Sequence, residues 1–220
     1  MVPVSSMKDY LKLRELAYDF RGRIEEVQRL YFDALYGFDA LHAQILKDRS
    51  SIRIQVNNPS LLTDELLDRS ITNYQYFGSE GPVAIPGIPG STQREALDRT
   101  QRNGGNSFTL AAQCIVVFAY WEHFLRQEIA SARGCKKADV LSPLWGDLAK
   151  IRNSLVHSRD RKASKDVGKC CEITWFKPGE KIDITLEQMR EIFRKLLLEH
   201  QALELESMPA TTGRINFATD

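Results

Sequence analysis

One long stretch near the N-terminus constrains the fold of this 220-residue chain more than any other feature. Between residues 7 and 48, apolar side chains recur at alternating steps of three and four residues. They are Leu13, Leu16, Phe20, Ile24, Val27, Tyr31, Ala34, Phe38, Leu41 and Ile45. This spacing predicts a long helix with one apolar face. The face can pack in the core of a helical bundle, which we favour, or along a partner chain as a coiled coil.

Three further helices follow from the sequence. The segment 106–133 is apolar almost all round until Trp121, which is typical of a central helix, and Gly134 ends it. Ser142 followed by Pro143 is a good helix start, and the helix it opens carries an apolar stripe. A last helix is predicted over 186–207.

The remaining segments predict loops, a turn and two short strands. Residues 78–105 are rich in glycine and proline and predict a loop insertion with little regular structure. Residues 170–176 and 181–184 predict two strands joined by the turn KPGE. We therefore expect an all-α helical bundle with a small β-hairpin before the last helix. It forms a single domain over 1–206, and 207–220 is a flexible tail.

Composition bears mainly on where the protein works. The net charge is +1, so a basic site must be a local cluster rather than a property of the whole molecule. No apolar run reaches the roughly 20 residues of a membrane span, and no signal peptide is evident, so we expect a cytoplasmic protein with no membrane contact. The four cysteines lack the spacing of a zinc site, and we expect no metal and no cofactor.

The string KIRNSLVHSRD, residues 150–160, contains the candidate active site. On a helix, Asn153 lies about 100° and His157 about 140° from Arg152, so the three can share one open edge. A histidine can move a proton at a ribose hydroxyl or at a leaving oxygen, and an arginine fork can hold phosphate oxygens. Asparagine can orient either group. The alternative is that all three are ordinary surface residues.

These residues resemble the motif of the HEPN superfamily, in which an arginine followed by a polar residue precedes a histidine by four to six residues. The resemblance covers about residues 106–206, including AYWEHFLRQEI and the final helix. It implies a metal-independent endoribonuclease that leaves 2′,3′-cyclic phosphate ends. Two subunits would pair so that both motif helices line one cleft.

Residue roles also follow from the resemblance. His157 would be the general acid or base, Arg152 the phosphate clamp and Asn153 the orienting amide. Glu122 would hold Arg152 by an ion pair, unless it pairs with Arg126 four residues on. Some HEPN members are inactive, so the alternative is an RNA- or protein-binding interaction module.

Basic and aromatic residues beside the motif are candidates for substrate binding. The cluster after His157 comprises Arg159, Arg161, Lys162, Lys165 and Lys169. It suits an RNA backbone, although a solvated loop has the same composition. Trp121 could stack on an unpaired base, or pack in the core. The expected partners are RNA, a second copy of the chain and an antitoxin or regulatory protein, in a toxin, stress or antiviral defence setting.

Overall fold

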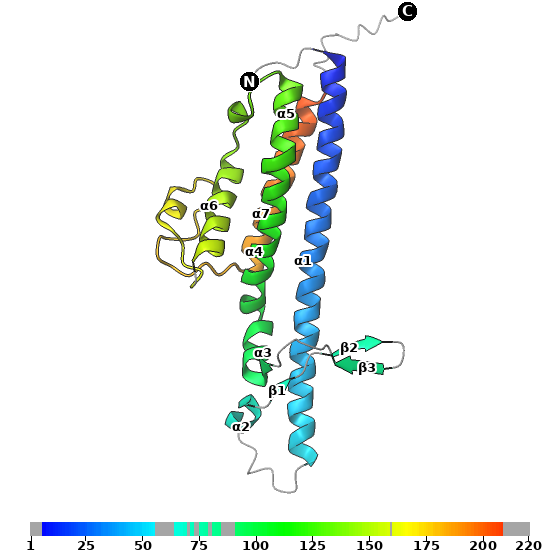
Figure 1. The fold of residues 1–220 in the computed structure, drawn as a ribbon, viewed down its shortest axis with the longest axis vertical. Helices are drawn as coiled ribbons and strands as arrows, with labels where there is room; N and C mark the ends of the chain where they lie inside the picture. The colour runs from blue at the N-terminus through cyan, green and yellow to red at the C-terminus, as the bar shows by residue number, and fades with distance from the viewer. Residues whose placement is uncertain are drawn as a thin grey trace, which may run out of the picture. The chain divides into compact units, whose positions relative to one another are not determined.

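The described part of the chain is mostly helical in the computed structural model, which confirms the all-α helical bundle (Figure 1). The structure describes residues 6–55, 64–69, 71–72, 75–78, 81–84, 91–158 and 160–208. None of the described helices combines the length and the apolar character needed to cross a bilayer.

The chain divides into two compact units, each made of more than one segment of the chain. Unit 1 contains Met1–Arg29, Ala111–Ile182 and Glu187–Asp220. Unit 2 contains Leu30–Leu110 and Asp183–Leu186. The candidate motif therefore lies wholly in unit 1.

Helix α1, Met7–Gln55, matches the predicted long helix and extends beyond residue 48. Most of its predicted stripe is buried, because these residues share one face. Leu13, Leu16, Phe20, Ile24, Val27, Tyr31 and Ile45 are each at most 5% exposed.

The central helical segment comprises α4, Arg102–Tyr120, a π-helical turn, Trp121–Leu125, and α5, Arg126–Arg133. In the π turn the Arg126 N–H donates to the Trp121 carbonyl oxygen five residues earlier. As predicted, the segment ends at Gly134, which has a left-handed φ of +65°. It begins earlier than predicted. Gly104 and Gly105 fall in the first turns of α4, where N–H groups need no helical partner.

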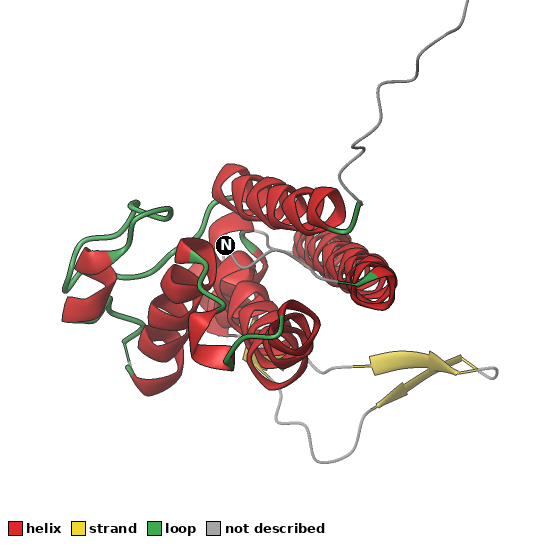
Figure 2. Cartoon of the chain, turned by 90° about the horizontal axis from the view of Figure 1, so that it is seen from above, coloured by secondary structure: helices red, strands yellow, loops and turns green. Residues whose placement is uncertain are grey.

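Aromatic side chains from four elements form the core of unit 1. Trp121 stacks on Trp145 of α6, Pro143–His157, with ring centroids 4.9 Å apart and planes 4° apart. Phe20 of α1 lies 6.0 Å from Trp145 and 6.5 Å from His200 of α7, Leu186–Glu206. The core thus ties α6 to the three long helices of the unit. Loops and turns join the described helices of this unit (Figure 2).

The hairpin predicted before the last helix does not form. The turn at Lys177–Glu180 is present, with Gly179 at φ +86°. The residues around the end of the turn instead bond to the segment after α6, where Ala163 N–H donates to Glu180 O (2.7 Å) and Ile182 N–H to Arg161 O (2.8 Å). The backbone of 171–173 is bound by a side chain of α6, described below. Both halves of the predicted hairpin therefore have other partners.

Unit 2 contains more regular structure than its glycine and proline content predicts. It comprises α2, Asp64–Arg69, the strands β1, Ile71–Thr72, β2, Gln75–Gly78, β3, Gly81–Ala84, and β4, Ser91–Thr92, and α3, Gln93–Thr100. Strand β1 pairs with β4 and β2 with β3, both antiparallel. Helix α3 begins inside the predicted loop 78–105 because Thr92 and Glu95 form a reciprocal capping box.

The predicted tail begins with a residue that belongs to the fold. Ser207, the first residue of the predicted tail, is buried and its N–H donates to Leu203 O at 3.1 Å. The rest of that tail, from residue 209 on, lies outside the described residues.

Candidate active site

Helix α6 holds the motif in a fixed orientation. The Ser142 hydroxyl accepts from the Trp145 N–H at 3.4 Å, and Pro143 is the first helical residue, as the sequence predicts. Leu148 and Ile151 are at most 2% exposed and anchor one face of the helix in the core. The opposite edge, which carries the motif, remains at the surface.

A buried carboxylate fixes the loop that follows α6. Asp147 is 1% exposed, and its Oδ2 accepts from the backbone N–H groups of Cys171 (2.8 Å), Glu172 (2.6 Å) and Ile173 (3.0 Å). Lys150 donates to Oδ1 at 3.0 Å. Burial raises the pKa of Asp147, but these hydrogen bonds outweigh it and leave the pKa below its ordinary value. Asp147 therefore ties α6 to residues 171–173.

Arg152 is held by a polar and an aromatic neighbour. Its Nε and Nη2 donate to Asn153 Oδ1 at 3.1 and 2.5 Å. Its guanidinium carbon lies 4.2 Å from the ring centroid of Phe118 on α4, the geometry of a cation–π contact. The fork is thus oriented from two sides, and Nη1 keeps no acceptor among the described residues.

His157 occupies the last turn of α6, one turn after Asn153, and both side chains are exposed. The chain turns directly after it. Ser158 O accepts from the Arg161 N–H at 3.2 Å, and the Ser158 hydroxyl accepts from the Lys162 N–H at 2.9 Å. This turn keeps the start of the basic segment next to the end of α6.

Glu122 forms ion pairs away from the motif, rather than the predicted pair with Arg152. Its carboxylate lies 3.1 Å from Arg126 Nη1 and 2.9 Å from Lys137 Nζ. The hydrogen bond from Lys137, helped by Arg126, lowers the pKa of Glu122 despite partial burial. The spacing of four residues brings Arg126 to Glu122, and Asn153 and Phe118 already hold Arg152.

The aromatic candidate for base stacking is also placed elsewhere. Trp121 is 6% exposed, and its ring is stacked on Trp145 inside the core. That ring face has no room for a base. The prediction that Trp121 binds substrate is therefore corrected to a packing role, because the π turn directs it inward with Leu125.

The basic candidates keep much of their charge available. Arg161 and Lys165 form no ion pair with the part of the chain that the structure describes, and Lys162 has only a long one of 3.7 Å to Asp160. Arg161 has a positive φ of 55°, which is unusual for a side-chain-bearing residue. Arg159 lies outside the described residues.

Two residues of the site were not predicted from the sequence. Asp147 lies on the buried side of α6, and a carboxylate there requires hydrogen-bond donors. The sequence therefore indicates that Asp147 needs hydrogen-bond donors, but it does not identify them. Phe118 lies one helical turn before Glu122, and nothing in the sequence distinguishes it from a core residue.

The arrangement offers acid–base and anion-binding chemistry. Within the described ranges, no group of three or more His, Cys, Asp or Glu side chains is placed to hold a metal ion. Comparisons of the chain with protein-family models, curated proteins and solved structures return no match.

Proposed function

We propose that the chain is a metal-independent endoribonuclease of the HEPN type. One observation carries the proposal: the Arg152 fork is oriented by Asn153 and Phe118, one helical turn or so from an exposed histidine. Such a pairing of an oriented guanidinium with a proton-transfer group suits phosphodiester cleavage.

The proposed reaction needs only these groups and the RNA itself. The ribose 2′-oxygen attacks the adjacent phosphorus, the bond to the 5′-oxygen breaks, and a 2′,3′-cyclic phosphate remains. His157 takes the 2′-hydroxyl proton or delivers one to the 5′-oxygen. Arg152 binds the phosphate oxygens, whose negative charge grows in the transition state. Asn153 acts through Arg152, since it accepts two of its hydrogen bonds.

A second copy of the chain is the proposed partner at this edge. Ile115 of α4 and Val156 of α6 are 42% and 53% exposed. They lie one helical turn from Phe118 and Arg152 respectively, so apolar surface flanks the motif on both helices. Pairing of two chains here would cover these side chains and supply two histidines to one cleft.

The basic segment is the proposed contact for the RNA backbone. Arg161, Lys162 and Lys165 follow the turn at Ser158, next to His157. A toxin, stress or antiviral defence role, under an antitoxin or regulatory protein, is part of the proposal and has its support in the motif resemblance.

One observation favours the alternative of a catalytically inactive RNA- or protein-binding module. Glu122 pairs with Arg126 and Lys137, so the acidic partner expected for Arg152 is engaged elsewhere. A module of this kind would bind RNA or protein through the same edge without cleaving it.

The test is RNA cleavage in excess EDTA by the full chain and its His157→Ala and Arg152→Ala variants. His123→Ala is the matched control, since His123 is also exposed but lies in the π turn. We expect loss of about a hundredfold or more in rate for both motif variants. The new ends should be cyclic phosphates, identified by mass.

Two outcomes would reject the enzyme. One is that no protein cleaves although all are folded and bind RNA, which supports the alternative module. The other is that His157→Ala cleaves as fast as the wild type, which would point to a contaminating nuclease.

A further inference from the structure

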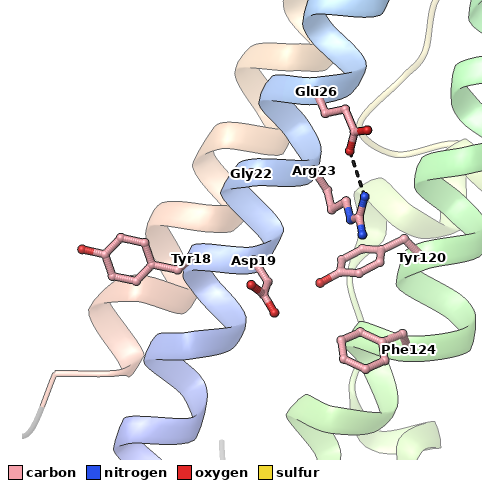
Figure 3. A pocket seen from close by; sticks show the side chains of 7 residues that line it. All are labelled: Tyr18, Asp19, Gly22, Arg23, Glu26, Tyr120 and Phe124. Atoms are coloured by element: carbon pink, nitrogen blue, oxygen red, sulfur yellow. Dashed lines mark hydrogen bonds and ion pairs between the residues drawn. The ribbon is translucent and has the colours of Figure 1, made fainter.

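A groove of about 560 Å³ opens in unit 1 between α1 and the segment where α4 meets the π turn (Figure 3). Helix α1 contributes Asp19, Gly22, Arg23 and Glu26, and the facing wall is formed by Tyr120 and Phe124. The volume is within the usual range for small-ligand sites. None of these residues belongs to the candidate active site.

The charges of the groove do not cancel. Arg23 Nη1 is paired with Glu26 Oε2 at 2.9 Å, so these two neutralise each other. The carboxylate of Asp19, which points toward the facing wall in Figure 3, forms no ion pair or hydrogen bond with the described residues. The groove therefore carries one unneutralised negative charge.

The aromatic wall already accepts a guanidinium. The guanidinium carbon of Arg23 lies 5.7 Å from the Tyr120 ring centroid, within cation–π range. The next ring along, Phe124, lies 5.5 Å from Tyr120 and is 45% exposed. Its ring has no cation over it among the described residues. A second cation could therefore stack on this wall beside Asp19.

A polar atom in the groove also lacks a partner. The Tyr120 hydroxyl is screened from solvent and forms no hydrogen bond with the described residues. Burial and the nearby Asp19 carboxylate raise the pKa of Tyr120, so its neutral form is favoured. A neutral phenol oxygen can accept a hydrogen bond from an ammonium or guanidinium group.

We propose that this groove binds an arginine or lysine side chain presented by a basic segment of a partner protein. Asp19 supplies the opposite charge, and Phe124 and Tyr120 supply ring faces for the cation and its alkyl stem. An RNA phosphate is a poor occupant, because it would meet the unneutralised carboxylate of Asp19. The proposal is independent of the nuclease proposed above and uses none of its residues.

Gly22 provides a way to close the groove without disturbing the fold. A Cβ added there meets no atom within 4 Å, and the same holds for Gly37 on the same helix outside the groove. Tryptophan at position 22 should therefore fill the groove, while tryptophan at position 37 should leave it open.

The test measures binding of a fluorescein-labelled peptide of alternating arginine and glycine by fluorescence anisotropy. A peptide of alternating glutamine and glycine is the neutral probe. The variants are Asp19→Asn and Gly22→Trp, with Asp33→Asn and Gly37→Trp as matched controls on α1. Binding is repeated with a single-stranded RNA oligomer as competitor.

We expect Asp19→Asn to weaken arginine-peptide binding about threefold to fivefold, the size of an exposed ion pair or cation–π contact. Gly22→Trp should weaken it more, while both controls should match the wild type. The proposal is overturned if the wild type does not bind the peptide, if the glutamine peptide binds equally, or if Asp19→Asn binds unchanged. It is also overturned if the RNA binds more tightly and loses affinity in Gly22→Trp. Should Gly22→Trp fail to fold, Asp19→Asn decides.

Discussion

Arg152 shows how two different neighbours can orient one guanidinium. Asn153 Oδ1 accepts two hydrogen bonds from the guanidinium, and the guanidinium carbon lies over the Phe118 ring. Together they restrict how the guanidinium can turn, and Nη1 remains without an acceptor among the described residues. A lysine could reproduce neither contact, because it lacks the planar fork.

Phe118 is therefore expected to act as a positioning residue for Arg152 in the proposed reaction. Replacing it by leucine removes the ring face but keeps an apolar side chain. We expect kcat/KM for RNA to fall about threefold to tenfold, mostly in kcat, while Phe118→Tyr retains activity. Equal losses in both variants, or a loss explained by unfolding in circular dichroism, would contradict this role.

Asp147 makes the free energy of unfolding depend on pH. Its pKa is lowered in the folded chain, so its contribution is present above the ordinary aspartate pKa of about 3.9 and is lost as the pH falls through the folded value. Asp147→Asn should lower the free energy of unfolding by roughly 2–4 kcal/mol at neutral pH, because three backbone donors lose a charged acceptor. Urea denaturation from neutral to acid pH measures both effects.

The control is Asp166→Asn, which removes an exposed carboxylate paired with Lys169. It should change the unfolding midpoint little, since exposed pairs contribute little. Equal midpoints for Asp147→Asn and the wild type would show that water can replace the carboxylate.

At the scale of elements, α1 contains two glycines that its packing does not require. Gly22 and Gly37 have helical backbones with open space around them. Alanine at either position should raise the free energy of unfolding by roughly 0.5–1 kcal/mol, because glycine has the larger entropy loss in a helix. Chemical denaturation of each variant tests this.

Gly134 is the matched contrast, since its φ of +65° is strained for any other residue. Gly134→Ala should therefore be destabilising by about 1 kcal/mol or more. If all three alanine variants shift stability in the same direction, backbone conformation does not explain the difference.

Helices could be predicted where their apolar stripes were long, as in α1 and in α4 with α5. Their ends were predicted where a local signal existed, at Ser142 and Gly134. The hairpin was predicted wrongly, because the backbone N–H groups of 171–173 donate to Asp147, a residue distant in sequence. Helix α3 was missed because its capping box lies in a glycine-rich context.

At the scale of the whole molecule, a net charge of +1 gives RNA no general attraction to this chain. Binding must then depend on a few local cations, so its salt dependence should be shallow. If about three phosphates contact the basic segment, log K should fall against log salt with a slope of about −2. Filter binding to single-stranded RNA at several salt concentrations measures it.

Lys165→Ala should reduce that slope by about 0.7, while Lys47→Ala, an exposed lysine of α1, should not change it. A steep slope shared by both variants would mean that cations spread over the surface bind the RNA.

The candidate site was only partly predictable from the sequence. Spacing on one helix grouped Arg152, Asn153 and His157, because helical geometry alone relates them. Helical spacing does not predict contacts with other elements. Phe118 of α4 contacts Arg152, and Glu122 pairs with Lys137. One sequence does not indicate which of several oppositely charged residues will pair with a given charged side chain.

The π turn at Trp121–Leu125 has a consequence for how similar chains should be aligned. It holds one residue more than an α-helical path of the same length, so deleting one residue there leaves a continuous helix. After that deletion the residues of α5 would keep their faces, whereas matching the extra residue to an α-helical path would offset them by about 100° relative to α4. An alignment of this chain with others must therefore permit a gap of one residue within this turn. Without it, the buried Ile129 and Ala130 would be matched to surface positions.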